Sequence, residues 1–310
     1  MSAVMTDALD GASVNSPVAK YVSRFADHKI GFGKQLRSEW LKMWTLRSTW
    51  WMMGATVVLM AGLSLLFAGV MDLVVNEMRG MGGGGAGAAD ISEMSVGIVI
   101  VVLGYQLAQL TVAVFATLTI TNEYSSGMIR ATLSATPRRL RTLLAKLVVV
   151  TLTTIVVTLV GLTLAWAVTY PLMSSNHTLV DFSQWDQVRS LLGTVLYLVM
   201  IAWMALGIGT LMRGSAGAIS TVMGLILVAP MILGMIVMFA PNIGWVGQIY
   251  RFLPSEAGQQ IVMQLDGMMG PDSGAMSVEM LSPWVGFAVL AAYAVAALAA
   301  GAWSMKRRDA

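Results

Sequence analysis

The sequence predicts an all-α membrane protein that crosses the bilayer six times, and composition and hydropathy together lead to this prediction. Of the 310 residues, 57% are hydrophobic and only 11% are charged, whereas a soluble domain has about 25% charged residues. Apolar runs of about 20 residues, long enough to cross a hydrocarbon core of about 30 Å, recur along the chain after residue 48. These runs leave no room for a second globular domain. We therefore predict a cytosolic amino-terminal segment, residues 1–48, and a six-span membrane domain, residues 49–310.

The amino-terminal segment divides into two parts. Residues 1–30 mix charged and small residues without the order of a cleavable signal, and we expect a disordered cytosolic lead. From Gly33 to Ser48 apolar side chains recur at helical spacing, which predicts an amphipathic helix that lies in the membrane interface. The residues expected to anchor this interfacial helix are Trp40, Lys42, Trp44 and Arg47.

Six apolar stretches follow, at residues 50–71, 95–120, 147–170, 191–211, 217–240 and 284–304. With both termini in the cytosol, the inner flanks of these spans hold thirteen Lys and Arg residues and the outer loops hold three. Cytosolic loops carry an excess of basic residues, so this orientation is strongly favoured over its reverse. We expect a multi-pass protein of the plasma membrane.

Several classes of function lack the residues that they need. The chain has no cysteine, its two histidines lie far apart, and the glycine-rich stretch at residues 81–87 is not followed by the lysine of a phosphate-binding loop. We therefore expect no catalytic site, no metal, no cofactor on this chain and no nucleic-acid partner. The six stretches also contain no charged residue, which makes ion-coupled carriers less favoured, because these usually need a titratable or ion-coordinating group at membrane depth.

Mild polar groups remain in the second span. Gln106, Gln109 and Thr117 share one helix face, which could line a translocation path or only hydrogen-bond to neighbouring helices. The longest outer loop, residues 241–283, contains a helical pattern after Pro254. We expect this loop to dip partly into the outer leaflet as a re-entrant segment, with an amphipathic surface helix as the alternative.

The cytosolic loop between the second and third spans carries the strongest motif. Ile129 and Leu133 form an apolar ridge on a short helix, and Pro137 disfavours its continuation. A ridge of this kind suits docking to a partner. The alternative is a basic loop that only sets the topology and meets anionic lipid.

This loop resembles that of ABC-2 type transporter permeases: a glutamate, a glycine about four residues later, an aliphatic pair, then proline, basic residues and lysine. The matching residues are Glu123, Gly127, Leu133, Pro137, Arg139 and Lys146. The stretches Glu39–Trp40–Leu41–Lys42 and Arg47–Ser48–Thr49–Trp50–Trp51 are similar to the amino-terminal signature of actinobacterial members. Arg251–Phe252–Leu253–Pro254–Ser255 extends the likeness to the outer loop.

The resemblance implies a permease subunit that works as a dimer, expected to be a homodimer, with a separate ABC ATP-binding subunit that holds ATP and Mg. It also implies that a cytosolic coupling helix docks on that subunit. The residues expected to couple are Glu123, Gly127, Ile129, Arg130, Leu133, Pro137 and Arg139. The few charges in the spans favour an amphipathic cargo, such as a drug, a peptide antibiotic or a lipid-like molecule, and export as the direction.

Two alternatives of other classes stay open. An ion-coupled secondary carrier would move its cargo along an imposed ion gradient without ATP. A non-transporting membrane anchor would only hold a cytosolic partner, so its outer loop and the face of Gln106 could change without effect.

Overall fold

The computed structural model describes residues 31–80, 96–128, 139–175, 179–240, 243–263 and 280–307, and the part from Phe32 onward forms one unit. Throughout these ranges the regular structure is helical and no strand is present. Six helical segments are long and apolar enough to cross a membrane. The prediction of an all-α, multi-pass membrane protein is confirmed.

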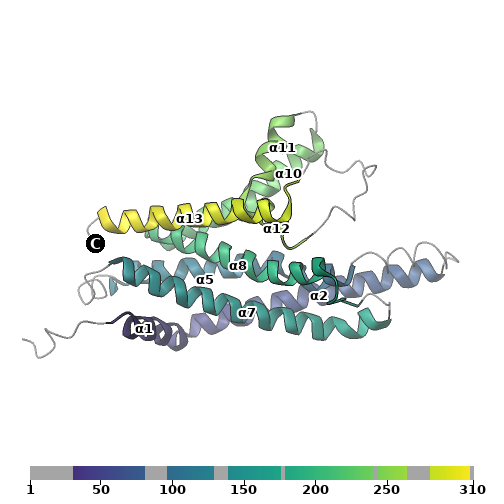
Figure 1. Ribbon diagram of the computed structural model, residues 1–310, viewed down its shortest axis with the longest axis horizontal. Coiled ribbons are helices and arrows are strands. Elements are labelled where there is room, and N and C mark those ends of the chain that lie inside the picture. The colour runs from purple at the N-terminus through teal and green to yellow at the C-terminus, as the bar shows by residue number, and fades with distance from the viewer. Residues whose placement is uncertain are drawn as a thin grey trace, which may run out of the picture. The chain divides into compact units, whose positions relative to one another are not determined.

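The helices of the described residues follow one another along the chain (Figure 1). Their bounds are α1 Phe32–Thr45, α2 Arg47–Gly80, α4 Val96–Val102, α5 Tyr105–Ser125, α7 Arg139–Ser175, α8 Trp185–Met212, α9 Ser215–Met223, the π-helix η1 Gly224–Val228, α10 Ala229–Phe239, α11 Gly244–Arg251, α12 Pro254–Gln259 and α13 Pro283–Arg307. The helices α4 and α5 together form the second span, and α9, η1 and α10 form the fifth.

The spans are longer than hydropathy alone predicts. The second continues to Ser125 rather than ending near residue 120, and the third begins at Leu140 rather than at residue 147. These extensions carry Glu123 and Lys146, both of which are buried. The helices therefore continue past the apolar runs because the charged side chains at their ends find partners inside the protein.

Helix α8 is the best-buried span. Two thirds of its most apolar window is buried (67%), whereas the corresponding share is 22% for α2, for α9–α10 and for α13. It packs against α5, α7 and α13, and Figure 1 shows α13 running alongside it. The three less buried spans expose large apolar side chains over most of their surface, as lipid-facing helices do.

Glycines allow some of these helices to approach very closely. An added Cβ at Gly207 of α8 would lie 2.5 Å from the backbone of Ala297 and Leu298 in α13. Close approach at small residues is how membrane helices gain packing energy where no hydrophobic force drives them together.

The segment between α10 and α13 is buried in part. Helix α12 packs against α13 and η1, and residues 253–258 and 260–263 are buried. The carbonyl of Ala257 lies where a Cβ on Gly286 would be, and the carbonyl of Ile261 lies 2.5 Å from the corresponding position at Gly193. Both α12 and the turn that follows it are thus held against α13 and α8.

Some predictions concern residues outside the described part. These are the lead at residues 1–30, the glycine-rich stretch at 81–87, most of the predicted coupling helix (Ile129, Arg130, Leu133 and Pro137), the side chain of Arg139, and the outer loop at residues 264–279.

Replacing Gly207 with alanine tests the α8–α13 contact. We expect Gly207→Ala to destabilise the protein by about 1–3 kcal/mol, because the methyl group forces two backbones apart. Gly62→Ala in α2, where no heavy atom lies within 4 Å of the added Cβ, is the matched control and should be neutral or slightly stabilising. Unfolding of the purified protein by SDS measures both; equal effects would contradict the contact.

Candidate functional site

Helix α1 buries a polar face rather than its most apolar one. Gln35, Glu39 and Met43, spaced four residues apart, are its buried residues, whereas Leu41 and Trp44 are exposed. The buried face packs against α7, where the Gln35 side-chain amide donates a hydrogen bond of 2.7 Å to the hydroxyl of Thr142. Such a face needs polar partners in the rest of the protein, because burying unpaired polar groups is costly.

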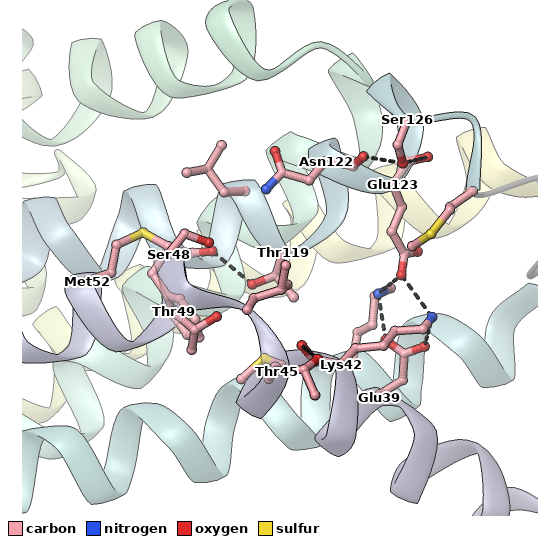
Figure 2. Close-up of a pocket in the computed structure, with 16 residues that line it drawn as sticks. Glu39, Lys42, Thr45, Ser48, Thr49, Met52, Thr119, Asn122, Glu123 and Ser126 are labelled. Atoms are coloured by element: carbon pink, nitrogen blue, oxygen red, sulfur yellow. Dashed lines mark hydrogen bonds and ion pairs between the residues drawn. The ribbon is translucent and has the colours of Figure 1, made fainter.

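Four charged side chains from three helices provide those partners, and we call them the ion network: Glu39 and Lys42 of α1, Glu123 of α5 and Lys146 of α7. The Lys146 ammonium lies 2.6 Å from Oε2 of Glu39 and 2.7 Å from Oε1 of Glu123. Lys42 lies 2.8 Å from Oε1 of Glu39 and 3.1 Å from Oε1 of Glu123. Each lysine is therefore held between the same two carboxylates. Figure 2 shows Lys42 between Glu39 and Glu123.

The ion network is electrically neutral and largely buried. Only 2% of the Lys146 side chain and 4% of the Glu39 side chain are exposed, whereas Lys42 is 35% exposed. Desolvation of buried ions costs several kcal/mol each, so such a network adds little net stability. Removing one of the four charged side chains, in contrast, strongly destabilises the protein, because the remaining charges are left buried and unpaired.

The charges shift the ionisation of the α1 members. Burial alone would raise the pKa of Glu39, but the ammonium groups of Lys146 and Lys42 bring it below its ordinary value. Burial alone would lower the pKa of Lys42, but the carboxylates of Glu39 and Glu123 raise it above its ordinary value. Both groups are therefore charged at neutral pH.

The ion network lies at the two ends of the loop that the sequence singles out. Glu123 is in the last turn of α5, and Lys146 follows the start of α7 by seven residues. Their contact therefore joins the two helix ends between which the predicted coupling loop lies in the sequence. Gly127 has a φ of +69° just after the C-cap Ser126. Glycine is favoured there because a left-handed residue commonly ends a helix.

A pocket of about 350 Å³ lies beside the ion network. Glu39, Lys42, Glu123 and Lys146 contribute to its wall. So do the start of α2, the end of α5 and Met128. Figure 2 shows residues of α1, α2 and α5 around this pocket.

Tryptophans gather where α1 meets α2. The ring centroids of Trp40 and Trp44 lie 5.8 Å apart, and those of Trp44 and Trp50 lie 4.7 Å apart in an edge-to-face pair. The indole N–H of Trp50 donates to the carbonyl of Trp44 at 3.1 Å. Trp44, Arg47 and Trp50 are all exposed. Trp40, Trp44 and Trp50 thus form one aromatic cluster. Lys42, which was also predicted as an anchor, instead belongs to the ion network.

A second polar cluster lies at the other end of α5, and we call it the tyrosine–glutamine cluster. It joins α5 to α8 and α12 through Tyr105, Gln106, Gln109, Tyr197 and Gln259. The Tyr197 hydroxyl donates to Gln109 at 2.5 Å, and the Tyr105 hydroxyl donates to Gln259 at 3.1 Å. The Gln106 amide donates to the Tyr105 hydroxyl at 2.9 Å. These contacts hold α12 against the spans.

The carboxyl group of Glu256 extends this cluster. It accepts a hydrogen bond from Gln259 at 2.5 Å and interacts with the Tyr250 hydroxyl. Burial raises the pKa of Glu256 above its ordinary value, although the hydrogen bonds from Tyr250 and Gln259 oppose part of this shift. No role for Glu256 is predicted from the sequence, because it lies in a stretch outside the spans; its position next to a predicted helical pattern was the only signal.

The candidate path residues are engaged in hydrogen bonds. Gln106 and Gln109 belong to the tyrosine–glutamine cluster, and the Thr117 hydroxyl donates to the carbonyl of Ala113 in its own helix at 2.8 Å. Hydrogen bonding between helices was the alternative to a translocation path. The path stays a prediction.

Comparison with known families adds one finding. Residues 81–310 match the family described as Protein of unknown function (DUF2705). The matched range begins after α2 and includes Glu123, Lys146 and Glu256. No curated protein matches the chain.

Replacing Lys146 tests the ion network. We expect Lys146→Met to destabilise the protein by about 3–5 kcal/mol, because Glu39 and Glu123 then share the single charge of Lys42. Arg141→Met removes a charge from an exposed residue of the same helix and should change stability by less than about 0.5 kcal/mol. SDS-induced unfolding of the purified variants measures the difference. Similar losses in both would contradict the role of the ion network.

The raised pKa of Glu256 predicts a pH dependence of stability. Between the ordinary value of 4.5 and the higher folded value, the folded protein binds a proton that the unfolded chain does not. Stability should therefore fall as pH rises through this window, and Glu256→Gln should remove that slope. Thermal unfolding of both proteins from pH 4 to pH 8 measures it; parallel curves would contradict a buried, proton-binding Glu256.

Proposed function

The chain belongs to the DUF2705 family of proteins of unknown function, and we propose that it is the membrane-spanning subunit of an ATP-driven exporter. ATP hydrolysis takes place on a separate ATP-binding subunit. Two copies of this chain, as a homodimer, assemble with two such subunits in the plasma membrane, with both termini in the cytosol. No catalytic residue and no cofactor belong to this chain in the proposal.

The observation that carries this proposal is the ion network. It joins α1, the end of α5 and the start of α7 by three contacts between 2.6 and 3.1 Å. A soluble partner that moves the loop between Glu123 and Arg139 therefore moves three helices together. Rigid elements joined in this way convert the movement of a docked partner into tilting of spans.

The loop itself is the docking element in this proposal. Ile129 and Leu133 supply its apolar ridge and Arg130 and Arg139 its charges, while Gly127 and Pro137 set its bounds. Glu123 and Lys146 attach the two ends of the loop firmly to the spans. A loop attached in this way transmits the movement of a docked soluble subunit to the membrane helices. Resemblance to ABC-2 type permeases led to this role, and the buried contacts at both ends support it.

The surface of α1 suits a position in the membrane interface. Its polar face is buried against α7 while Leu41 and Trp44 remain exposed, and aromatic residues are enriched at membrane–water interfaces. Helix α1 then lies along the cytosolic surface of the bilayer. In this position the side chains of Lys42 and Arg47 are close to the polar headgroups of the lipids.

At the outer side, α11 and α12 form a re-entrant segment in this proposal. Its support is the burial of residues 253–258 and 260–263 and the hydrogen bond between Gln259 and Tyr105 of a spanning helix. Buried polar backbone is tolerated within a membrane where protein surrounds it. The cargo is amphipathic, and it passes the face of α5 that carries Gln106, Gln109 and Thr117 when the tyrosine–glutamine cluster opens.

A second candidate, an ion-coupled carrier, is favoured by one observation. Glu256 is a buried carboxyl group with a raised pKa that contacts the spans through Gln259, and carriers need a titratable group of this kind. Cargo movement driven by an imposed proton gradient without ATP, and abolished by Glu256→Gln, would favour the carrier over the exporter.

Co-purification with a co-expressed ABC ATPase, chosen as the candidate partner, tests the exporter. We expect the wild-type protein to bind that ATPase and to stimulate its ATP hydrolysis. Gly127→Ala, which strains the loop at a positive φ, and Glu123→Gln should each lower the stimulation roughly fivefold or more. Gly217→Ala, where the added Cβ makes an ordinary contact of 3.5 Å, is the matched control and should retain it.

Two other results would contradict the exporter proposal. If no ATPase binds, or if the two loop variants stimulate hydrolysis like the wild type, the exporter proposal fails. If the ATPase binds and no cargo moves with ATP or with an ion gradient, the chain is a membrane anchor for its partner.

A further inference from the structure

The fifth span changes its helix type in the middle. After α9, the π-helix η1 runs over Gly224–Val228, and α10 follows. The N–H of Ala229 donates to the carbonyl of Gly224, five residues earlier. Pro230 comes next, and it has no N–H to donate to the carbonyl of Ile226, four residues before it. The backbone hydrogen bonds are thus irregular at η1, and helices bend most readily at prolines and π-helical turns.

The two sides of η1 pack against different parts of the protein. Helix α9 packs against α5 and α8, and its buried Val222 belongs to the main apolar core. Helix α10 packs against α11, and we call these two helices the α10–α11 hairpin. The hairpin contributes Val237, Val246 and Tyr250 to a separate apolar cluster. In Figure 1 it lies outside the bundle of α5, α7, α8 and α13. A unit with its own apolar cluster can move as one body about a hinge.

Tyr250 of α11 connects the hairpin to the spans. Its ring packs against α10, where a Cβ added at Gly234 would lie 3.3 Å from Cε2 of the tyrosine. Its hydroxyl donates a hydrogen bond to the carboxyl group of Glu256 in α12. Glu256 accepts from Gln259, and Gln259 accepts from Tyr105 of α5. The Tyr250 hydroxyl thus joins the hairpin to a chain of hydrogen bonds that reaches the second span.

We propose that the α10–α11 hairpin is a lid that swings about η1, and that the hydrogen bond between Tyr250 and Glu256 holds the lid closed. The structure shows the closed form, in which Tyr250 is 7% exposed and Glu256 is 9% exposed. Outward movement of the hairpin breaks this hydrogen bond and uncovers Glu256, which leads to the tyrosine–glutamine cluster. The lid does not depend on ATP-driven export, because it would give access to that cluster in an exporter and in an ion-coupled carrier alike.

Distances between pairs of spin labels on the full-length purified protein test this inference without any ATPase present. The chain has no cysteine, so cysteines can be introduced and labelled without background. The lid pair combines Gln248→Cys in α11 with Leu192→Cys in α8. The control pair combines Val285→Cys in α13 with the same Leu192→Cys, and it reports on helices that the lid leaves in place. All three residues are exposed, so the labels should not disturb packing.

Two substitutions probe the closing contact and the hinge. Tyr250→Phe removes the hydroxyl and keeps the ring against Gly234, so a second lid-pair distance should increase in population by about tenfold, the scale of one hydrogen bond. Such a rise is measurable because minor states commonly hold about 0.1–10% of the molecules. Tyr293→Phe alters an exposed tyrosine of α13 and should match the wild type. Adding Pro230→Ala to Tyr250→Phe restores an N–H in the fifth span, which should stiffen η1 and reduce the second population.

The lid is supported if the second distance increases in Tyr250→Phe, is absent from the control pair and decreases when Pro230→Ala is added. The same lid-pair distances in Tyr250→Phe and in the wild type overturn it. An equal change in the lid pair and the control pair also overturns it, because the whole protein would then have loosened. A second distance that persists with Pro230→Ala overturns the hinge at η1. If the double variant does not fold, the comparison of Tyr250→Phe with Tyr293→Phe decides alone.

Discussion

The ion network is the interaction on which the α1 end of the structure depends. Glu39 and Glu123 bring two negative charges into a mostly buried site, and Lys42 and Lys146 neutralise them from α1 and α7. Because each buried ion costs several kcal/mol to desolvate, the four charges are tolerable only together. Helix α1 is attached to the spans by the face that carries Gln35, Glu39 and Met43, while Leu41 and Trp44 remain exposed. The two ends of the predicted docking loop are fixed by the same contacts.

Helix α5 connects this site to a second one. Glu123 lies near its carboxyl end, and Tyr105, Gln106 and Gln109 lie near its amino end, where they bond to α8 and α12. Movement of α5 along or about its axis would act on both clusters at once. In the exporter that we propose, this helix carries the effect of the ATPase at one side of the membrane to the buried α12 segment at the other. The closely packed α8–α13 pair, with Gly207 against Ala297, supplies a fixed reference for that movement.

Much of this fold could be predicted from the sequence, because hydropathy is a local property. Six apolar stretches predict six spans, and all six are present. The predicted second span ended too early and the predicted third span began too late. Hydropathy scores Glu123 and Lys146 as solvated charges, whereas their pairing allows α5 and α7 to include them. That pairing is not local: Lys146 and Glu39 are separated by 107 positions. Their membership in motifs similar to those of ABC-2 type permeases marked these residues, but did not indicate that they touch.

Other parts of the two sites had only a weak signal in the sequence. Gln35 is a single polar residue on a helix that was predicted from its apolar residues, so the sequence does not indicate that it is buried. Its hydrogen bond to Thr142 explains the burial. Glu256 follows a proline in a segment outside the spans, where a charged residue is expected to be solvated. Burial of α12 between α13 and α8 changes its environment, and with it the pKa.

The most direct test of the central claim is a double-mutant cycle on ATP hydrolysis by the proposed ATPase partner, with Glu39→Gln and Lys146→Met made singly and together. Residues that act as one unit are strongly non-additive. If the ion network transmits movement as a unit, the second substitution should cause no further loss. The double variant should then stimulate ATP hydrolysis at least as well as the more impaired single variant. Losses that multiply, or single variants that stimulate hydrolysis like the wild type, would contradict the account.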